Sequence, residues 1–166
     1  MTEDRIEITT PDGVIDGYVY HTDDGKPRPG IIHYTDIFGI RDANRGMAFR
    51  LAEEGYTVLL PNVFYRTGRP PILDRSAGPE EIRARFDELK APLTPEALDG
   101  DATAYVEYLT GLEHVSHGAI GVVGTGGPTL VNCTLTGNAA PAEAGSAVYV
   151  DYAASAGVTA TNTIIW

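Results

Sequence analysis

The sequence predicts an α/β fold, in which a parallel sheet is flanked by helices and followed by a short β-rich tail. Three observations predict it. Short apolar runs alternate with segments of helical length between residues 30 and 123, an order that builds parallel sheets through helical crossovers. Two strand-like runs joined by turn residues precede them. Beyond about residue 127, charged side chains almost vanish and β-prone residues dominate.

The first elements read as a hairpin and a buried strand. Residues 6–10 alternate apolar and polar side chains, and residues 14–21 form a second run after the turn sequence Pro11-Asp12-Gly13. Residues 30–34 are a short apolar run of the kind found in buried parallel strands. We therefore expect two antiparallel strands followed by the first parallel one.

A helix is expected next, from about residue 42 to residue 54, with Gly55 as its C-terminal stop. Residues 56–61 then read as another buried strand. The apolar side of this helix is expected to consist of Met47, Phe49, Leu51 and Ala52.

Two more helices and a strand complete the series. One helix is expected over residues 79–89 and another over residues 95–109, where Thr94 is a good cap and Pro95 suits the first helical position. Residues 119–123 form the last strand of this part. Ligands of such sheets bind beyond the carboxyl ends of the strands, so the loops after Tyr34, Pro61 and Val123 are where a site is expected.

The charge and composition exclude several classes of partner. The net charge is −11, which repels nucleic acid and anionic membrane surfaces, so neither is expected as a partner. No apolar run approaches the roughly 20 residues of a membrane-spanning helix. The acidic start at residues 1–5 is unlike a secretory signal, so a cytoplasmic protein is expected.

No cofactor or metal is expected either. The single cysteine, Cys133, rules out an internal disulfide. The histidines do not lie at the spacings of zinc ligands. They are His21, His33, His114 and His117.

Three consecutive segments carry a resemblance to a known family. They are Ile32-His33-Tyr34-Thr35-Asp36-Ile37-Phe38-Gly39-Ile40-Arg41, Leu51-Ala52-Glu53-Glu54-Gly55-Tyr56 and Val58-Leu59-Leu60-Pro61-Asn62-Val63-Phe64-Tyr65-Arg66. In this order they resemble the dienelactone hydrolase family, over residues 1 to about 124. The resemblance implies a partial α/β-hydrolase-type parallel sheet and, by descent, hydrolysis of a small ester or lactone.

The same resemblance assigns two site residues. Asp36 matches the family's acid beside the nucleophile, and the backbone N–H of Ile37 matches a donor of the oxyanion hole. A fixed N–H stabilises developing negative charge without reorganising. The alternative is that Asp36 only caps or turns a surface loop, as many aspartates do.

The nucleophile and the catalytic histidine of the family are absent from this chain. The family's elbow, Gly-x-Cys-x-Gly or Gly-x-Ser-x-Gly, is expected after the strand at residues 119–123. The sequence there is Gly124-Thr125-Gly126-Gly127-Pro128, without serine or cysteine. Thr125 stands one place too early, and Cys133 is flanked by no glycines. No histidine follows His117, although in this family the histidine follows the nucleophile. The chain is therefore expected to be catalytically incomplete.

The tail has a different character. All 12 Lys and Arg residues precede residue 91, and Glu143 and Asp151 are the charged residues from 128 onward. Residues 128–138 and 145–166 resemble coils of right-handed parallel β-helices of surface proteins, although a partly disordered coil is an equal alternative. Two parts are expected: residues 1–127, ending at the elbow, and a tail of residues 128–166.

This division leaves the strand at residues 119–123 at the edge of the sheet. An uncovered edge strand favours pairing with another chain, so a homodimer through this edge is a candidate, with residues 146–152 as an alternative cover. Two further alternatives stay open: a non-catalytic binding module, and a truncated or fused gene product without selected function. The candidate side chains for holding a substrate carboxylate are Arg66, Arg69, Arg83 and Arg85.

Overall fold

The computed structural model describes residues 1–74, 76–116, 121–123, 129–131, 134–135, 159–161 and 164–165. A five-stranded sheet forms its centre, in the order β1-β2-β4-β3-β5. Its strands are β1 (Thr2–Thr10), β2 (Gly13–His21), β3 (Gly30–His33), β4 (Thr57–Pro61) and β5 (Gly121–Val123).

The sheet is mixed. β3 pairs in parallel with β4 and with β5, as predicted, whereas the hairpin strands β1 and β2 are antiparallel to each other and β2 is antiparallel to β4. The hairpin turn therefore lies at the same edge of the sheet as the carboxyl ends of β3 and β4, because Gly17 pairs with Pro61 and Tyr20 with Val58.

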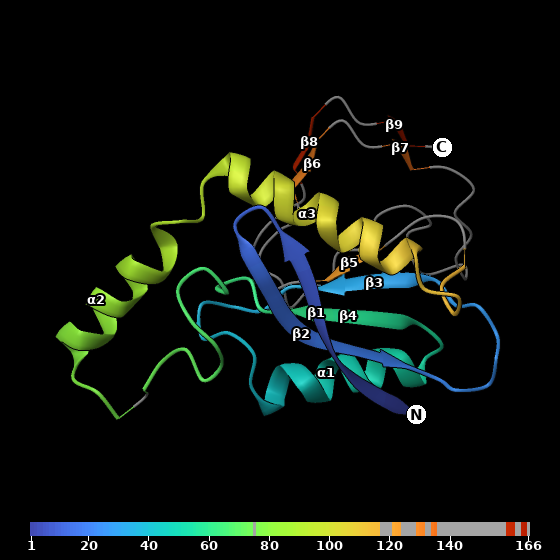
Figure 1. Cartoon of the computed structure of the whole chain (residues 1–166), viewed down its shortest axis with the longest axis horizontal. Coiled ribbons are helices and arrows are strands. Elements are labelled where there is room, and N and C mark those ends of the chain that lie inside the picture. Colours follow the sequence, from blue (N-terminus) through green and yellow to red (C-terminus); the bar gives the residue numbers. More distant parts are fainter. Residues whose placement is uncertain are drawn as a thin grey trace.

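Helices cover both faces of the sheet (Figure 1), as predicted. α1 (Asp42–Glu53) packs on the face formed by Ile31, Val58 and Leu60, whereas α3 (Pro95–Thr110) packs on the face formed by the alternate residues Ile32 and Leu59. Alternation along the strands thus divides the core into two layers, one on each side of the sheet.

The buried side of α1 differs from the predicted one. Ala48 and Ala52 face the sheet, while Met47 is 37% exposed and Phe49 is 40% exposed. Alanine lets the helix backbone approach the strands closely, and the positions i and i+4 fall on one side of a helix. The predicted apolar side of α1 was therefore right for Ala52, which is buried, and for Leu51, which packs on this core, but wrong for Met47 and Phe49.

α3 begins as predicted, because the Thr94 hydroxyl accepts a hydrogen bond from the Ala97 N–H at 3.2 Å. The remaining helix, α2 (Pro79–Lys90), extends away from the sheet in Figure 1. Its buried residue Leu89 packs with Val63, Phe64 and Ile72 of the loop after β4. α2 is therefore anchored to the loops at the carboxyl edge rather than to the strands.

In the tail, the described residues form four short strands. β6 (Thr129–Val131) pairs in parallel with β8 (Thr159–Thr161), and β7 (Thr134–Leu135) pairs in parallel with β9 (Ile164–Ile165). Cys133 and residues 146–152 lie outside the described residues. The division at residue 127 and the likeness to β-helix coils stay predictions.

Within the part of the chain that the structure describes, no helix combines the length and the apolar character needed to cross a bilayer.

Candidate active site at the carboxyl edge of the sheet

The loop after β3 holds Asp36 in a tight turn. Its carboxylate oxygen Oδ1 accepts the Phe38 N–H at 3.0 Å, and its backbone carbonyl accepts the Gly39 N–H at 3.0 Å. Gly39 has φ +69°, a conformation that side chains rarely adopt. A Cβ added at Gly39 would lie 2.6 Å from Ile72 Cδ1. The Asp36-Ile37-Phe38-Gly39 sequence therefore sets the path of this loop.

The charge of Asp36 is balanced within the same loop. Its other carboxylate oxygen, Oδ2, forms an ion pair with the Arg41 guanidinium. Both side chains are partly exposed, 23% for Asp36 and 35% for Arg41. The guanidinium also lies over the Phe38 ring, 5.1 Å from its centroid. Arg41 is a partner that the sequence analysis did not single out, although it is five residues away.

The backbone N–H of Ile37 is available for an incoming group. Among the described residues it has no hydrogen-bond acceptor. The Ile37 side chain is partly buried against the cluster of Val63, Phe64, Ile72 and Leu89, which holds the peptide in place. This arrangement is compatible with an oxyanion-hole donor, and the catalytic roles of Asp36 and Ile37 stay predictions.

α2 contacts this loop through an aromatic pair. The rings of Phe38 and Phe86 meet edge to face, with centroids 5.7 Å apart and planes at 79°. Arg85 of the same helix donates from Nε to the Ile72 carbonyl at 2.9 Å. The sequence carried no signal for this contact, because nothing in the local pattern of either segment specifies the other.

Of the arginines considered for a substrate carboxylate, three are paired with carboxylates of the protein. Arg66 binds Asp101 and Asp12, Arg69 binds Asp16, and Arg85 binds Glu88. Arg83 is exposed. The Arg66 side chain is 11% exposed and that of Asp101 is 4% exposed. Arg66 is therefore part of a buried structural network.

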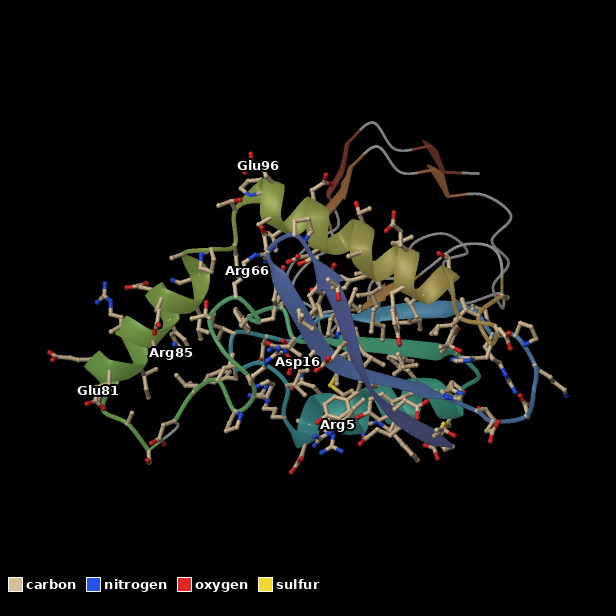
Figure 2. The ribbon with its side chains drawn as sticks, in the orientation of Figure 1. Arg5, Asp16, Arg66, Glu81, Arg85 and Glu96 are labelled. Carbon is tan, nitrogen blue, oxygen red and sulfur yellow. The ribbon has the colours of Figure 1, made fainter. Side chains whose placement is uncertain are left out.

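This network lies beside a groove of about 460 Å³ between the hairpin turn and α3. Arg66 donates from Nη1 to Asp101 Oδ2 at 2.7 Å and from Nη2 to Asp101 Oδ1 at 2.9 Å, and the Tyr65 hydroxyl donates to Asp101 Oδ1 at 3.0 Å. Figure 2 shows Arg66 below the start of α3, where Glu96 is labelled. The groove is lined by Thr10, Asp12, Arg66, Glu96, Asp101 and Glu107, among others.

His33 is a buried residue at the end of β3. Its side chain is 1% exposed, and neither ring nitrogen has a partner in the described part of the chain. Burial lowers the pKa of His33, so its ring is neutral at pH 7. His33 pairs in register with Val123, the last residue of β5.

No candidate metal site stands out elsewhere. In the described ranges, no group of three or more His, Cys, Asp or Glu side chains is arranged to hold a metal ion. The absence of a cofactor or metal stays a prediction. Residues 124–128, at the expected elbow, lie outside the described residues. Their sequence contains no serine or cysteine.

The comparison with known families decides the relationship. The model of the dienelactone hydrolase family matches residues 15–149 of this chain. The chain belongs to the dienelactone hydrolase family. The match continues beyond residue 127, where the sequence analysis placed the start of the tail.

Curated relatives agree with the family. A Rhodococcus opacus carboxymethylenebutenolidase is 35% identical over 72 residues, covering 43% of this chain and 29% of the relative. A Methylorubrum extorquens protein assigned as a carboxymethylenebutenolidase is 26% identical over 120 residues, covering 72% of this chain and 39% of the relative. The chain thus matches well under half of the length of each.

Solved structures agree with the fold. A Klebsiella pneumoniae crystal structure assigned as a dienelactone hydrolase superposes with a TM-score of 0.64 at 18% identity, covering 84% of this chain and 62% of that protein. A dienelactone hydrolase-like promiscuous phosphotriesterase from metagenomic libraries superposes with a TM-score of 0.55 at 22% identity, covering 74% of this chain and 48% of that protein. The predicted fold class is confirmed.

Proposed function

We propose that this chain is a catalytically incomplete member of its family, which keeps the oxyanion-stabilising half of an ester or lactone site. The observation that carries the proposal is the sequence after β5, where Gly126 occupies the place of the nucleophile in Gly-x-Cys-x-Gly. Glycine has no side chain that attacks a carbonyl. The Ile37 N–H in the loop after β3, which has no acceptor in the part of the chain that the structure describes, supports a retained oxyanion half.

The family supports the ligand class. The curated relatives named above are carboxymethylenebutenolidases, and a butenolide is a cyclic ester. A neutral or weakly charged ester or lactone also suits a protein with a net charge of −11, which repels large anions at long range. We therefore take a small ester or lactone as the ligand of the loop that contains Asp36.

Hydrolysis of a p-nitrophenyl ester by the folded protein tests the missing activity. No turnover above the buffer rate is expected from the unaltered chain. The variants Asp36→Ala and Cys133→Ala serve as comparisons. Turnover that either substitution abolishes would show that the nucleophile was misplaced or that the residual site is active, and would overturn the proposal.

Installing a thiol tests the retained half. In a Cys133→Ala background, Gly126→Cys places a thiol at the nucleophile position and Thr125→Cys places one a residue earlier. The thiolate attacks the ester carbonyl, a thioester forms, and p-nitrophenolate leaves. Because one oxyanion-hole donor changes rates by about 10²–10³, we expect acylation of the first thiol to be at least about tenfold faster. Equal rates would argue against a retained oxyanion hole.

A second candidate function is self-association through β5. Among the described strands, β5 lies at one end of the sheet order, and Val122 is 49% exposed. Light scattering is expected to show a dimer that Val122→Lys dissociates. Val106→Lys, at a residue of α3 that is 41% exposed, is the matched control. A monomer at all concentrations would exclude this candidate.

A further inference from the structure

Two histidine rings stack where the end of β2 meets the segment between α3 and β5. The centroids of the His21 and His114 rings are 4.0 Å apart and their planes differ by 21°. His21 Nε2 lies 2.9 Å from Asp4 Oδ2. Two further ring nitrogens, His21 Nδ1 and His114 Nε2, are buried and have no hydrogen-bond partner among the described residues. Two imidazoles this close tolerate one positive charge far better than two.

Backbone hydrogen bonds hold residues 114–116 against the sheet. The His114 carbonyl accepts the Arg28 N–H at 3.0 Å and the Thr57 hydroxyl at 3.2 Å. The Arg28 carbonyl in turn accepts the Ser116 N–H at 2.8 Å. Val115, between them, is 5% exposed and belongs to the core on the α3 side. Residues 114–116 are therefore held to the start of β3 and to β4 just before the chain enters β5.

Several charged or titratable groups surround the stack. β1 contributes Asp4, and the segment itself contributes Glu113. On α3, burial and then Asp4 raise the pKa of Tyr108. The Arg28 guanidinium is paired with Asp24 at 2.6 Å. Burial and then His21 lower the pKa of His114, and the two carboxylates Asp4 and Glu113 act in the opposite direction.

We propose that the His21–His114 stack is an acid-sensitive contact, called the clasp below, that holds residues 114–116 against the sheet. At neutral pH the lowered pKa of His114 keeps its ring uncharged, and residues 114–116 stay bound to the sheet in the closed form. Under acid conditions the His114 ring takes up a proton, its charge is disfavoured by burial and by His21, and residues 114–116 detach from the sheet to give the open form. Detachment of residues 114–116 weakens the pairing of β5 with β3. The family's nucleophile turn follows β5.

The direction of the pH dependence follows from linkage. The pKa of His114 is lower in the closed form than its ordinary value of 6.5. The closed form is therefore favoured fully above about pH 6.5 and loses that advantage as the pH falls toward the lowered pKa, because the open form binds the proton more readily. This behaviour is independent of any hydrolytic activity.

Hydrogen exchange at single amides tests the clasp in the unaltered chain. The protection of the Ser116 and Arg28 N–H groups, corrected for intrinsic exchange, is compared at about pH 7.5 and about pH 5. We expect protection at both amides to fall at acid pH, by about tenfold for each pKa unit of depression. The Asn62 N–H, which donates to the Asp16 carbonyl at 2.8 Å, is the distant reference and should not change beyond the intrinsic correction.

Three variants separate this contact from general acid instability. His114→Phe keeps a stacking ring without a titratable charge, and its Ser116 protection should become independent of pH. Asp4→Asn, at the surface, removes a carboxylate that favours the protonated His114 ring in the closed form, and should therefore deepen the loss of protection at about pH 5. His33→Leu, which removes another buried histidine, should leave the acid effect in place.

Three results would overturn the proposal. One is unchanged protection at Ser116 between the two pH values in the unaltered chain. Another is an acid effect that persists in His114→Phe. If that variant does not fold, the third result decides. It is a loss of Ser116 protection in Asp4→Asn, which alters a side chain that is 55% exposed, no larger than in the unaltered chain.

Discussion

The loops after β3 and after β4 both lie at the carboxyl edge of the sheet, yet they balance charge in different ways. After β3, Asp36 pairs with Arg41, a neighbour in sequence, and both side chains are partly exposed. After β4, Arg66 pairs with Asp101 of α3, and both side chains are largely buried. The first pair is a local feature of one loop, whereas the second joins segments 35 residues apart.

This difference indicates that the loop after β3 is the better candidate for binding a ligand, whereas the loop after β4 contributes to stability. A partly exposed ion pair contributes little free energy, so its carboxylate can exchange partners at low cost. A buried pair costs several kcal/mol to break, because the remaining charge is left without a partner. The ligand is therefore expected at the loop after β3, while the loop after β4 supports it.

The largest effect is expected from Asp101→Ala. The substitution removes the buried fork of hydrogen bonds on Arg66, which keeps only the half-exposed Asp12, and it removes the acceptor of the Tyr65 hydroxyl at Asp101. We expect a loss of about 3–5 kcal/mol in the free energy of unfolding, measured by urea denaturation. Asp99→Ala, at an exposed position of the same helix, should cost less than about 0.5 kcal/mol. Similar losses in both variants would break the comparison.

A smaller effect is expected from Gly39→Ala in the loop of Asp36. Gly39 and Gly25 share φ +69°, but a Cβ at Gly25 meets nothing within 4 Å, whereas at Gly39 it meets Ile72. We expect Gly25→Ala to cost about 1–2 kcal/mol for the left-handed backbone alone. Gly39→Ala should cost at least about 1 kcal/mol more, from overpacking. Thermal unfolding of both variants measures the difference, and equal costs would mean that Ile72 moves aside freely.

The smallest effect is expected from Asp36→Asn. The amide keeps an oxygen to accept the Phe38 N–H but loses the charge that pairs with Arg41. Because both side chains are partly exposed, the loss should be below about 1 kcal/mol and should shrink further in high salt. Asp42→Asn, at a fully exposed side chain 3.8 Å from Arg45, is the control. A loss of more than about 2 kcal/mol would assign Asp36 to the structural network instead.

Much of the fold could be predicted because its signals are local. The turn Pro11-Asp12-Gly13 lies where the hairpin turns, and Thr94 caps α3 as expected. The loop of Asp36 was also located, since it follows directly from the end of β3. In each case a side chain acts on backbone groups within a few residues, and the sequence contains both partners.

Other features could not be predicted in the same way. The exposed Met47 and Phe49 of α1 show that apolar size does not decide which side of a helix meets a sheet. The contact between Phe38 and Phe86, and the stack of His21 and His114, join segments far apart in the chain. No spacing rule connects such residues before the strands are ordered.

The sequence by itself determined the family, the α/β order of the elements and the absence of a serine or cysteine at residues 124–128. The tertiary structure decided which charges are paired. It placed Arg66 against Asp101 and Asp12, so that this arginine is occupied. It also paired Asp36 with Arg41, beside an Ile37 N–H that has no acceptor among the described residues. The physical reason is that a motif depends on neighbours along the chain, whereas the partner of a charged side chain depends on which elements pack beside it.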